Sequence, residues 1–131
     1  MTYRQIYENA LRLICEIGDG TDTADYEERA SYILATFLGQ CAPMDRQYRE
    51  AHQMTAHTVA PVACVNPDHT FELAEVFVTP AEHYLAAMLV LDENEEMSER
   101  FFSLYTDEIS ALLDSLPCVC ESIRDRYSLL I

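Results

Sequence analysis

Residues 79–116 read TPAEHYLAAMLVLDENEEMSERFFSLYTDEISALLDSL, and this stretch decides the fold class. Every residue from Tyr84 to Leu91 is apolar, and a helix that is apolar on all sides is normally surrounded by protein. The acidic run 92–96 separates it from a longer segment with apolar residues at three- and four-residue steps, the period of an amphipathic helix. Two helices folded back on each other, one of them buried, predict an all-α helical bundle.

The boundaries of this helical hairpin follow from its end residues. Thr79 is placed to cap the first helix, Pro80 suits the first helical position, and Glu82 stands at the capping-box position. We therefore predict one helix over 80–91 and a second over 94–116, which Pro117 ends.

Two more main helices precede the hairpin. Apolar periodicity predicts a helix over 2–17, ended by Gly18, and another over 22–42, which Pro43 ends or kinks. Residues 44–53 are compatible with a short further helix. The segment 52–78 is irregular and partly extended, because residues 56–65 are mostly small or β-branched and are interrupted by proline. The whole chain, 1–131, is expected to form one domain of four main helices with a tail at 117–131.

Composition excludes several function classes. The net charge is −15, and all eight basic residues are Arg, so the chain would repel nucleic acid and anionic membranes. No apolar run reaches the ~18 residues of a membrane span, and residues 1–5 do not begin a signal peptide. Five cysteines, an odd number, argue against a disulfide scaffold. We expect an intracellular protein with no sequence-specific nucleic-acid partner and no membrane partner.

A search for catalytic and metal-binding patterns gives only weak candidates. Cys118 and Cys120 are separated by one residue, whereas zinc and redox motifs use two or more. The histidines of the irregular segment match no ligand spacing, even with Asp68 or Cys64. Neither acidic run, 19–28 or 92–96, has the residue pattern of a calcium-binding loop. We predict no catalytic residue, no metal, no cofactor and no enzymatic activity. The three histidines of the irregular segment are His52, His57 and His69.

Protein–protein contacts are the favoured mode of action. A long irregular segment in a compact domain is more often functional than idle, and exposed apolar ends favour association. The apolar end of the tail either docks on its own core or is offered to a neighbour, and the residues leave both readings open. The predicted contact residues are Val59, Val62, Val65, Phe71, Tyr127, Leu129, Leu130 and Ile131.

Several short segments resemble one family. They are YEERA (26–30), CAPMD (41–45), FEL (71–73) before VTP (78–80), YLAAMLVLDEN (84–94) with the helix that follows to Tyr105, and SIRDRY (122–127). Together they are similar to small all-helical head–tail connector, adaptor or neck proteins of tailed bacteriophages and prophages. They are patterns of core and turn residues spread over most of the chain, and none is a catalytic motif.

The resemblance implies a structural role in phage or prophage assembly. Copies would form a homo-oligomeric ring beneath the portal, with neighbouring neck, portal and tail proteins as partners, in the bacterial cytoplasm and in the virion neck. The acidic surface would suit a channel through which DNA passes without sticking. The alternative is a generic intracellular helical interaction or regulatory domain, and a metal-dependent enzyme is the third class. Genes for portal, capsid and tail proteins beside this one would favour the phage reading.

Overall fold

The structure, a computed structural model, describes residues 1–14 and 23–116. It contains four α-helices: α1 (Tyr3–Leu13), α2 (Thr23–Ala51), α3 (Val78–Leu89) and α4 (Glu95–Ser115). A single 3-10 turn, η1 (Glu75–Phe77), leads directly into α3. The described residues form no β-strand, and their one isolated bridge joins Thr2 and Thr70. The chain is a single-domain all-α bundle, and the predicted fold class is confirmed.

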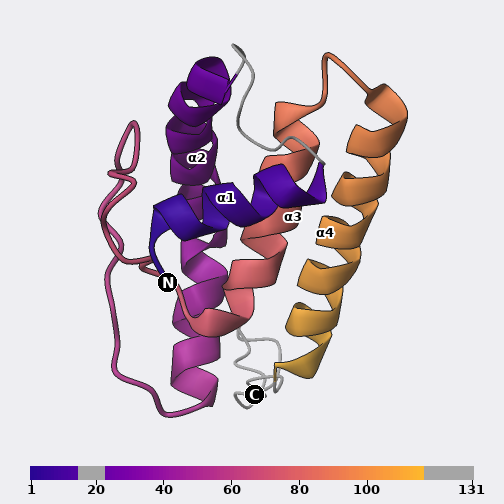
Figure 1. Cartoon of the computed structure of the whole chain (residues 1–131). Coiled ribbons are helices and arrows are strands. Elements are labelled where there is room, and N and C mark those ends of the chain that lie inside the picture. The colour runs from indigo at the N-terminus through magenta and orange to yellow at the C-terminus, as the bar shows by residue number, and fades with distance from the viewer. Residues whose placement is uncertain (15–22, 117–131) are drawn as a thin grey trace, which may run out of the picture.

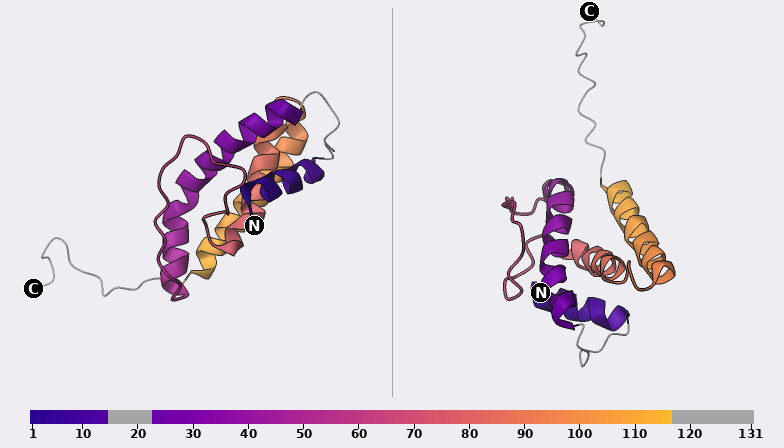
Figure 2. Two further views of the ribbon diagram at one scale, coloured as in Figure 1. Left: turned by 60° about the vertical axis from the view of Figure 1, so that its left-hand side comes forward. Right: turned by 90° about the horizontal axis from the view of Figure 1, so that it is seen from above.

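Helix α3 is the centre of the bundle. Helices α2 and α4 lie on either side of it, and α1 crosses in front of α2 and α3 (Figure 1). The view from above shows the same order, with α3 between its two neighbours (Figure 2). From Tyr84 to Ala87 every side chain of α3 is buried, as are Leu89 and Val90 after them. The predicted apolar central helix is therefore confirmed.

Helix α1 begins with a capping box that the sequence prediction did not identify. The backbone N–H of Gln5 donates to Thr2 Oγ1 (3.3 Å), and the backbone N–H of Thr2 donates to Gln5 Oε1 (2.8 Å). Ile6 and Ala10 lie on the buried face of the helix. The helix ends at Leu13, earlier than the predicted Ile17, and Gly18, predicted to end it, lies outside the described residues.

Helix α2 is longer than predicted, because Pro43 does not end it. The helix runs to Ala51 and absorbs the segment 44–53 almost entirely. Pro43 has no N–H to donate to the carbonyl of Gly39, one turn earlier. Both residues lie on the exposed face, where water can hydrate that carbonyl, and α2 is visibly bent in Figure 2. The predicted end at residue 42 is wrong, because proline costs a helix less on its solvent side than within a packed face, whereas the alternative of a kinked helix agrees with the bend of α2.

Helix α3 begins differently from the prediction. Its first residue is Val78, preceded by η1 with Phe77 as the N-cap, so Thr79 lies inside the helix and makes no capping box. Helix α4 does have a side-chain cap, since the backbone N–H of Met97 donates to Asn94 Oδ1 (3.0 Å). Both helix starts lie within two residues of the predicted positions.

The irregular segment, predicted over 52–78, runs outside α2 from residue 52 to residue 74 (Figure 1). It returns to the bundle through buried Phe71 and Leu73. Cys118, Cys120 and the predicted contact residues Tyr127, Leu129, Leu130 and Ile131 lie outside the described residues. Within the described part of the chain, no helix has the length and apolar character needed to cross a membrane.

Candidate interaction surface

Helix α4 is held to the bundle mainly by α3. The Ser98 hydroxyl donates a buried hydrogen bond to the carbonyl of Ala87 (2.8 Å), and His83 Nδ1 pairs with a Glu108 carboxylate oxygen. The His83 side chain is mostly covered and stacks on Phe101. These polar contacts fix the orientation of α4 about its own axis.

Although α4 is rich in apolar residues, the bundle covers it only partly. Ser98 is the only buried residue among its 21. Phe102 is 46% exposed and Leu113 is 43% exposed. Residues seven and eleven positions apart share one side of a helix, so Phe102, partly buried Ile109 and Leu113 lie along one side of α4, with Thr106 between the first two. We name these three residues the α4 ridge.

Apolar surface of this kind favours association. Burying apolar area against a partner contributes roughly 25 cal/mol for each Å² removed from water. Contiguous exposed apolar patches on otherwise polar proteins mark interaction sites more often than isolated apolar residues do. Leu104, on the opposite side of α4, and Leu91, in the turn before it, are also exposed. The α4 edge of the bundle is therefore the strongest candidate surface for binding protein.

The same helix is strongly acidic. It carries six carboxylates and one Arg, and that residue, Arg100, forms only a long, exposed ion pair with Glu96 (3.9 Å). An exposed pair of this kind contributes little, so the charge of α4 is largely uncompensated. A partner surface must therefore combine apolar contact with the absence of negative charge.

The second candidate surface is the outer part of the irregular segment, residues 52–64, which we name the arm. Its first end is tied to α2 by Arg49. The backbone N–H of Met54 donates to the Arg49 carbonyl (2.8 Å), and Arg49 Nη1 donates to the Thr55 carbonyl (3.2 Å). Arg49 is itself held by Asp45, whose Oδ2 accepts from Arg49 Nε (2.9 Å). Asp45 Oδ1 accepts from the backbone N–H of Ala74 (2.8 Å).

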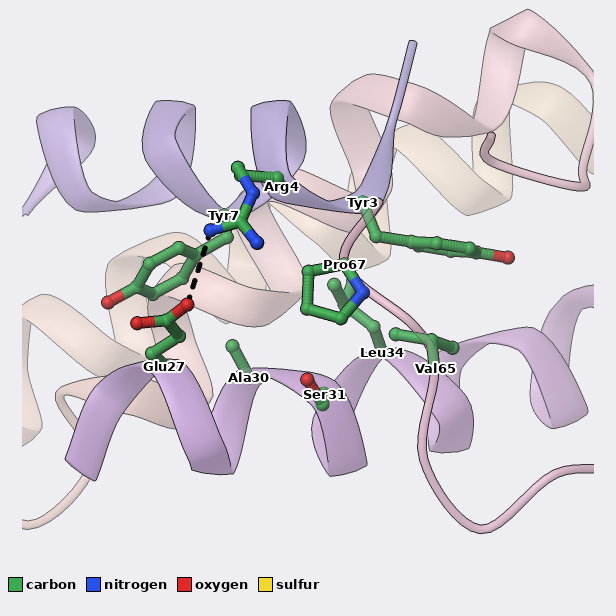
Figure 3. Close-up of a pocket in the computed structure, with 9 residues that line it drawn as sticks. All are labelled: Tyr3, Arg4, Tyr7, Glu27, Ala30, Ser31, Leu34, Val65 and Pro67. Carbon is green, nitrogen blue, oxygen red and sulfur yellow. Dashed lines mark hydrogen bonds and ion pairs between the residues drawn. The ribbon is translucent and has the colours of Figure 1, made fainter. Parts of the chain in front are cut away.

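The chain just after the arm is anchored between α1 and α2. The backbone N–H of Val65 donates to the Ser31 carbonyl (3.1 Å), and that of Arg4 donates to the Pro67 carbonyl (2.8 Å). Figure 3 shows these residues around a cavity of ≈ 10 Å³, whose lining includes the Arg4–Glu27 ion pair (3.3 Å). A space of that size holds about one water molecule, so these residues form a packed contact between the chain, α1 and α2, and not a ligand site.

The predicted contact residues of the irregular segment differ in how exposed they are. Val62 is 50% exposed, and Val59 is half-buried beside the core. Val65 and Phe71 belong to the core, where Phe71 packs edge-on against Tyr3. Of these four residues, Val62 and part of Val59 are open to a partner, while Val65 and Phe71 hold the returning chain to the bundle.

The histidines and cysteines of the described residues are dispersed. His52 stacks on Tyr48 (4.1 Å between ring centroids), while His57 and His69 are exposed. Across residues 1–14 and 23–116, no group of three or more His, Cys, Asp or Glu side chains is arranged to hold a metal ion. Cys64 is exposed. Burial raises the pKa of the Cys41 thiol to about 11, which keeps it protonated and unreactive at neutral pH.

Two larger depressions lie near the irregular segment. One, of ≈ 480 Å³, is lined by Met1, Leu73 and Glu75 among others, and the second, of ≈ 370 Å³, lies beside Arg49 and His57. Neither gathers a nucleophile with an adjacent base and an orienting group, the arrangement that covalent catalysis requires. The second depression offers contact area at the base of the arm.

The α4 ridge was not among the contact residues predicted from the sequence. Its signal was present, because Phe102 and Leu104 stand on either side of the regular stripe of Phe101, Tyr105 and Leu112. An apolar arc wider than one neighbouring helix can cover indicates a second partner. Comparison of the chain with family models, curated protein sequences and solved structures finds no match.

Proposed function

We propose that this chain is a structural protein of a tailed bacteriophage or prophage, a head–tail connector or adaptor that acts through protein–protein contacts in a ring of identical copies. The supporting observation is the α4 ridge, an apolar line that the chain's own described helices leave exposed. Neighbouring neck, portal and tail proteins are the further partners, and the bacterial cytoplasm and the virion neck are the proposed locations.

The body of the bundle suits such a role. Most of the residues of its central helix are buried, so the outer elements pack on a well-packed core. The arm and α4 lie on opposite sides of α3 and leave two separate edges for neighbours (Figure 1). Ring assemblies need two different surfaces on each copy, because heterologous contacts close by rotation.

The net charge of −15 fits a ring that conducts DNA. An acidic lining repels phosphate, so DNA would pass without being bound. In this proposal the acidic side chains outside the copy-to-copy contact face the channel. A ring with these side chains on its outer wall would exclude the channel role while leaving the connector role intact.

The oligomeric state of the purified full chain tests the proposal. We expect a discrete species of several copies by light scattering and a ring by negative-stain microscopy. Phe102→Asp should convert it to monomer, because the new charge would be buried at the contact. Tyr32→Asp replaces another exposed aromatic residue, on α2, and serves as the matched control that keeps the ring.

A wild-type chain that stays monomeric at every soluble concentration would contradict the connector proposal. A monomer that binds one protein with fixed stoichiometry would instead identify a regulatory interaction domain, the competing class.

A further inference from the structure

Two apolar features of the molecule lie at opposite edges. The arm runs outside α2, and the α4 ridge lies on the helix at the far side of α3 (Figure 1). In the view from above, the same two elements are again the outermost parts of the described body (Figure 2). One copy therefore cannot bring its own arm onto its own α4 while the bundle stays intact.

Most of the arm makes no hydrogen bond to the rest of the described chain, so its backbone and side chains can contact a partner. Between Thr55 and Val65, where it is tied down, no hydrogen bond links the segment 56–64 to the other described residues. Val62 is exposed near the middle of this stretch, and small or β-branched residues surround it. Since both ends are anchored, the loss of conformational entropy on docking is confined to residues 56–64.

The negative charge of α4 favours a partner surface that carries no negative charge. Residues 51–67, which include the whole arm, contain no Asp, Glu or Arg, although the chain carries 23 acidic residues. The only titratable groups of the arm are His52, His57 and Cys64. Placing this neutral segment on α4 avoids like-charge repulsion, whereas packing α4 against the α4 of a second copy would bring two acidic helices together.

We propose that the arm of one copy docks on the α4 ridge of the next copy, so that Val62 packs among Phe102, Ile109 and Leu113. This inference rests on the proposed ring function and names the two surfaces that build it. The contact is heterologous: each copy supplies an arm at one edge and a ridge at the other, and repetition with a fixed rotation closes a ring.

Complementation between two variants tests this arrangement. Val62→Asp damages the arm and keeps the ridge, whereas Phe102→Asp damages the ridge and keeps the arm. Each variant alone should be monomeric by light scattering. An equimolar mixture should form a dimer of twice the monomer mass and nothing larger, because one intact arm meets one intact ridge. Val76→Asp, at another exposed valine, should assemble as the wild type does.

Each outcome decides the question. If the wild type forms rings and Val62→Asp still does, or if the mixture stays monomeric, the arm-to-ridge contact is overturned while the connector proposal stands. If Leu130→Asp alone abolishes assembly and Val62→Asp does not, the tail and not the arm occupies the ridge. A monomeric wild type would overturn both proposals. Far-UV circular dichroism checks folding, and Phe102→Gln replaces Phe102→Asp if helix content falls.

Discussion

Asp45 shows how one buried charge organises the arm. Its side chain is 1% exposed, and each of its two oxygens accepts a hydrogen bond, one from Arg49 and one from the backbone of Ala74. These two bonds link the last turns of α2 to the chain that returns from the irregular segment. A buried carboxylate is tolerated only when it is paired and hydrogen-bonded, as it is here.

We predict that Asp45→Ala lowers the free energy of unfolding by about 3–5 kcal/mol, because it leaves the Arg49 cation and the Ala74 N–H without their partner. Urea unfolding of both proteins measures the difference. Asp25→Ala breaks an exposed ion pair with Arg29 (3.8 Å) and serves as the control, with a loss of at most about 1 kcal/mol. Equal losses in the two variants would contradict the role given to Asp45.

Several buried hydroxyl and thiol groups make the fold sensitive to alkali. Burial raises the pKa of Cys41 above its ordinary value of 9.0 to about 11 and that of Tyr3 above 10.0 to about 12. Burial also raises the pKa of Tyr105, with the charge of Cys41 as the next cause. In each case the folded state holds the proton more tightly than the unfolded state does.

The contribution of these groups to stability should therefore be constant below about pH 9 and should fall as the pH rises towards 12. The folded chain binds more protons than the unfolded chain in this window, so the free energy of unfolding decreases with pH. Urea midpoints measured at neutral pH and across pH 9–11 test the slope. Cys41→Ala should flatten it in that range, and an unchanged slope would show that Cys41 does not contribute.

At the scale of elements, α2 and α4 show how the surroundings change the outcome of a local pattern. Pro43 lies within α2 because its ring and the unbonded carbonyl of Gly39 face solvent. Helix α4 has the expected amphipathic pattern, yet its apolar arc is wider than α3 can cover. In both helices the feature that the sequence did not predict lies on the exposed side: Pro43 within α2, and the wide apolar arc of α4.

The exposed turn before Pro43 is weakened by Gly39, and this can be corrected. A Cβ built on Gly39 meets nothing within 4 Å. Gly39→Ala should therefore raise the free energy of unfolding by roughly 0.5–1 kcal/mol, since alanine loses less backbone entropy in a helix. Gln47→Ala, another exposed position of α2, should change it by less than about 0.5 kcal/mol. Thermal denaturation followed at 222 nm compares the two, and a destabilised Gly39→Ala would contradict this account.

At the scale of the whole molecule, the residues after α4 are the remaining candidate for assembly. We predict that removing residues 129–131 weakens assembly and leaves helix content intact, because three apolar side chains leave a contact between copies. Light scattering measures the first effect and far-UV circular dichroism the second. Loss of helix content in the shortened chain would place these residues in the chain's own core instead.

Much of the fold was predictable from the sequence, but less of the candidate surface was. The burial of α3 and the apolar faces of α1 and α2 follow from the local spacing of apolar residues. Among the predicted contact residues, Val62 lies at the surface, while Val65 and Phe71 lie in the core. Their apolar character is the same in the sequence, and only the path of the chain separates exposed from buried.

The sequence by itself determined the all-α class, the central position of α3 and the acidic character of the molecule, because helical periodicity and charge are local properties. The tertiary structure alone decided that Pro43 stays inside a helix, that Asp45 and His83 are covered, and that Phe102 and Leu113 are not. Burial depends on which distant segments meet. Asp45 and Ala74 are 29 residues apart, and His83 and Glu108 are 25 apart, so no local pattern foretells their contacts.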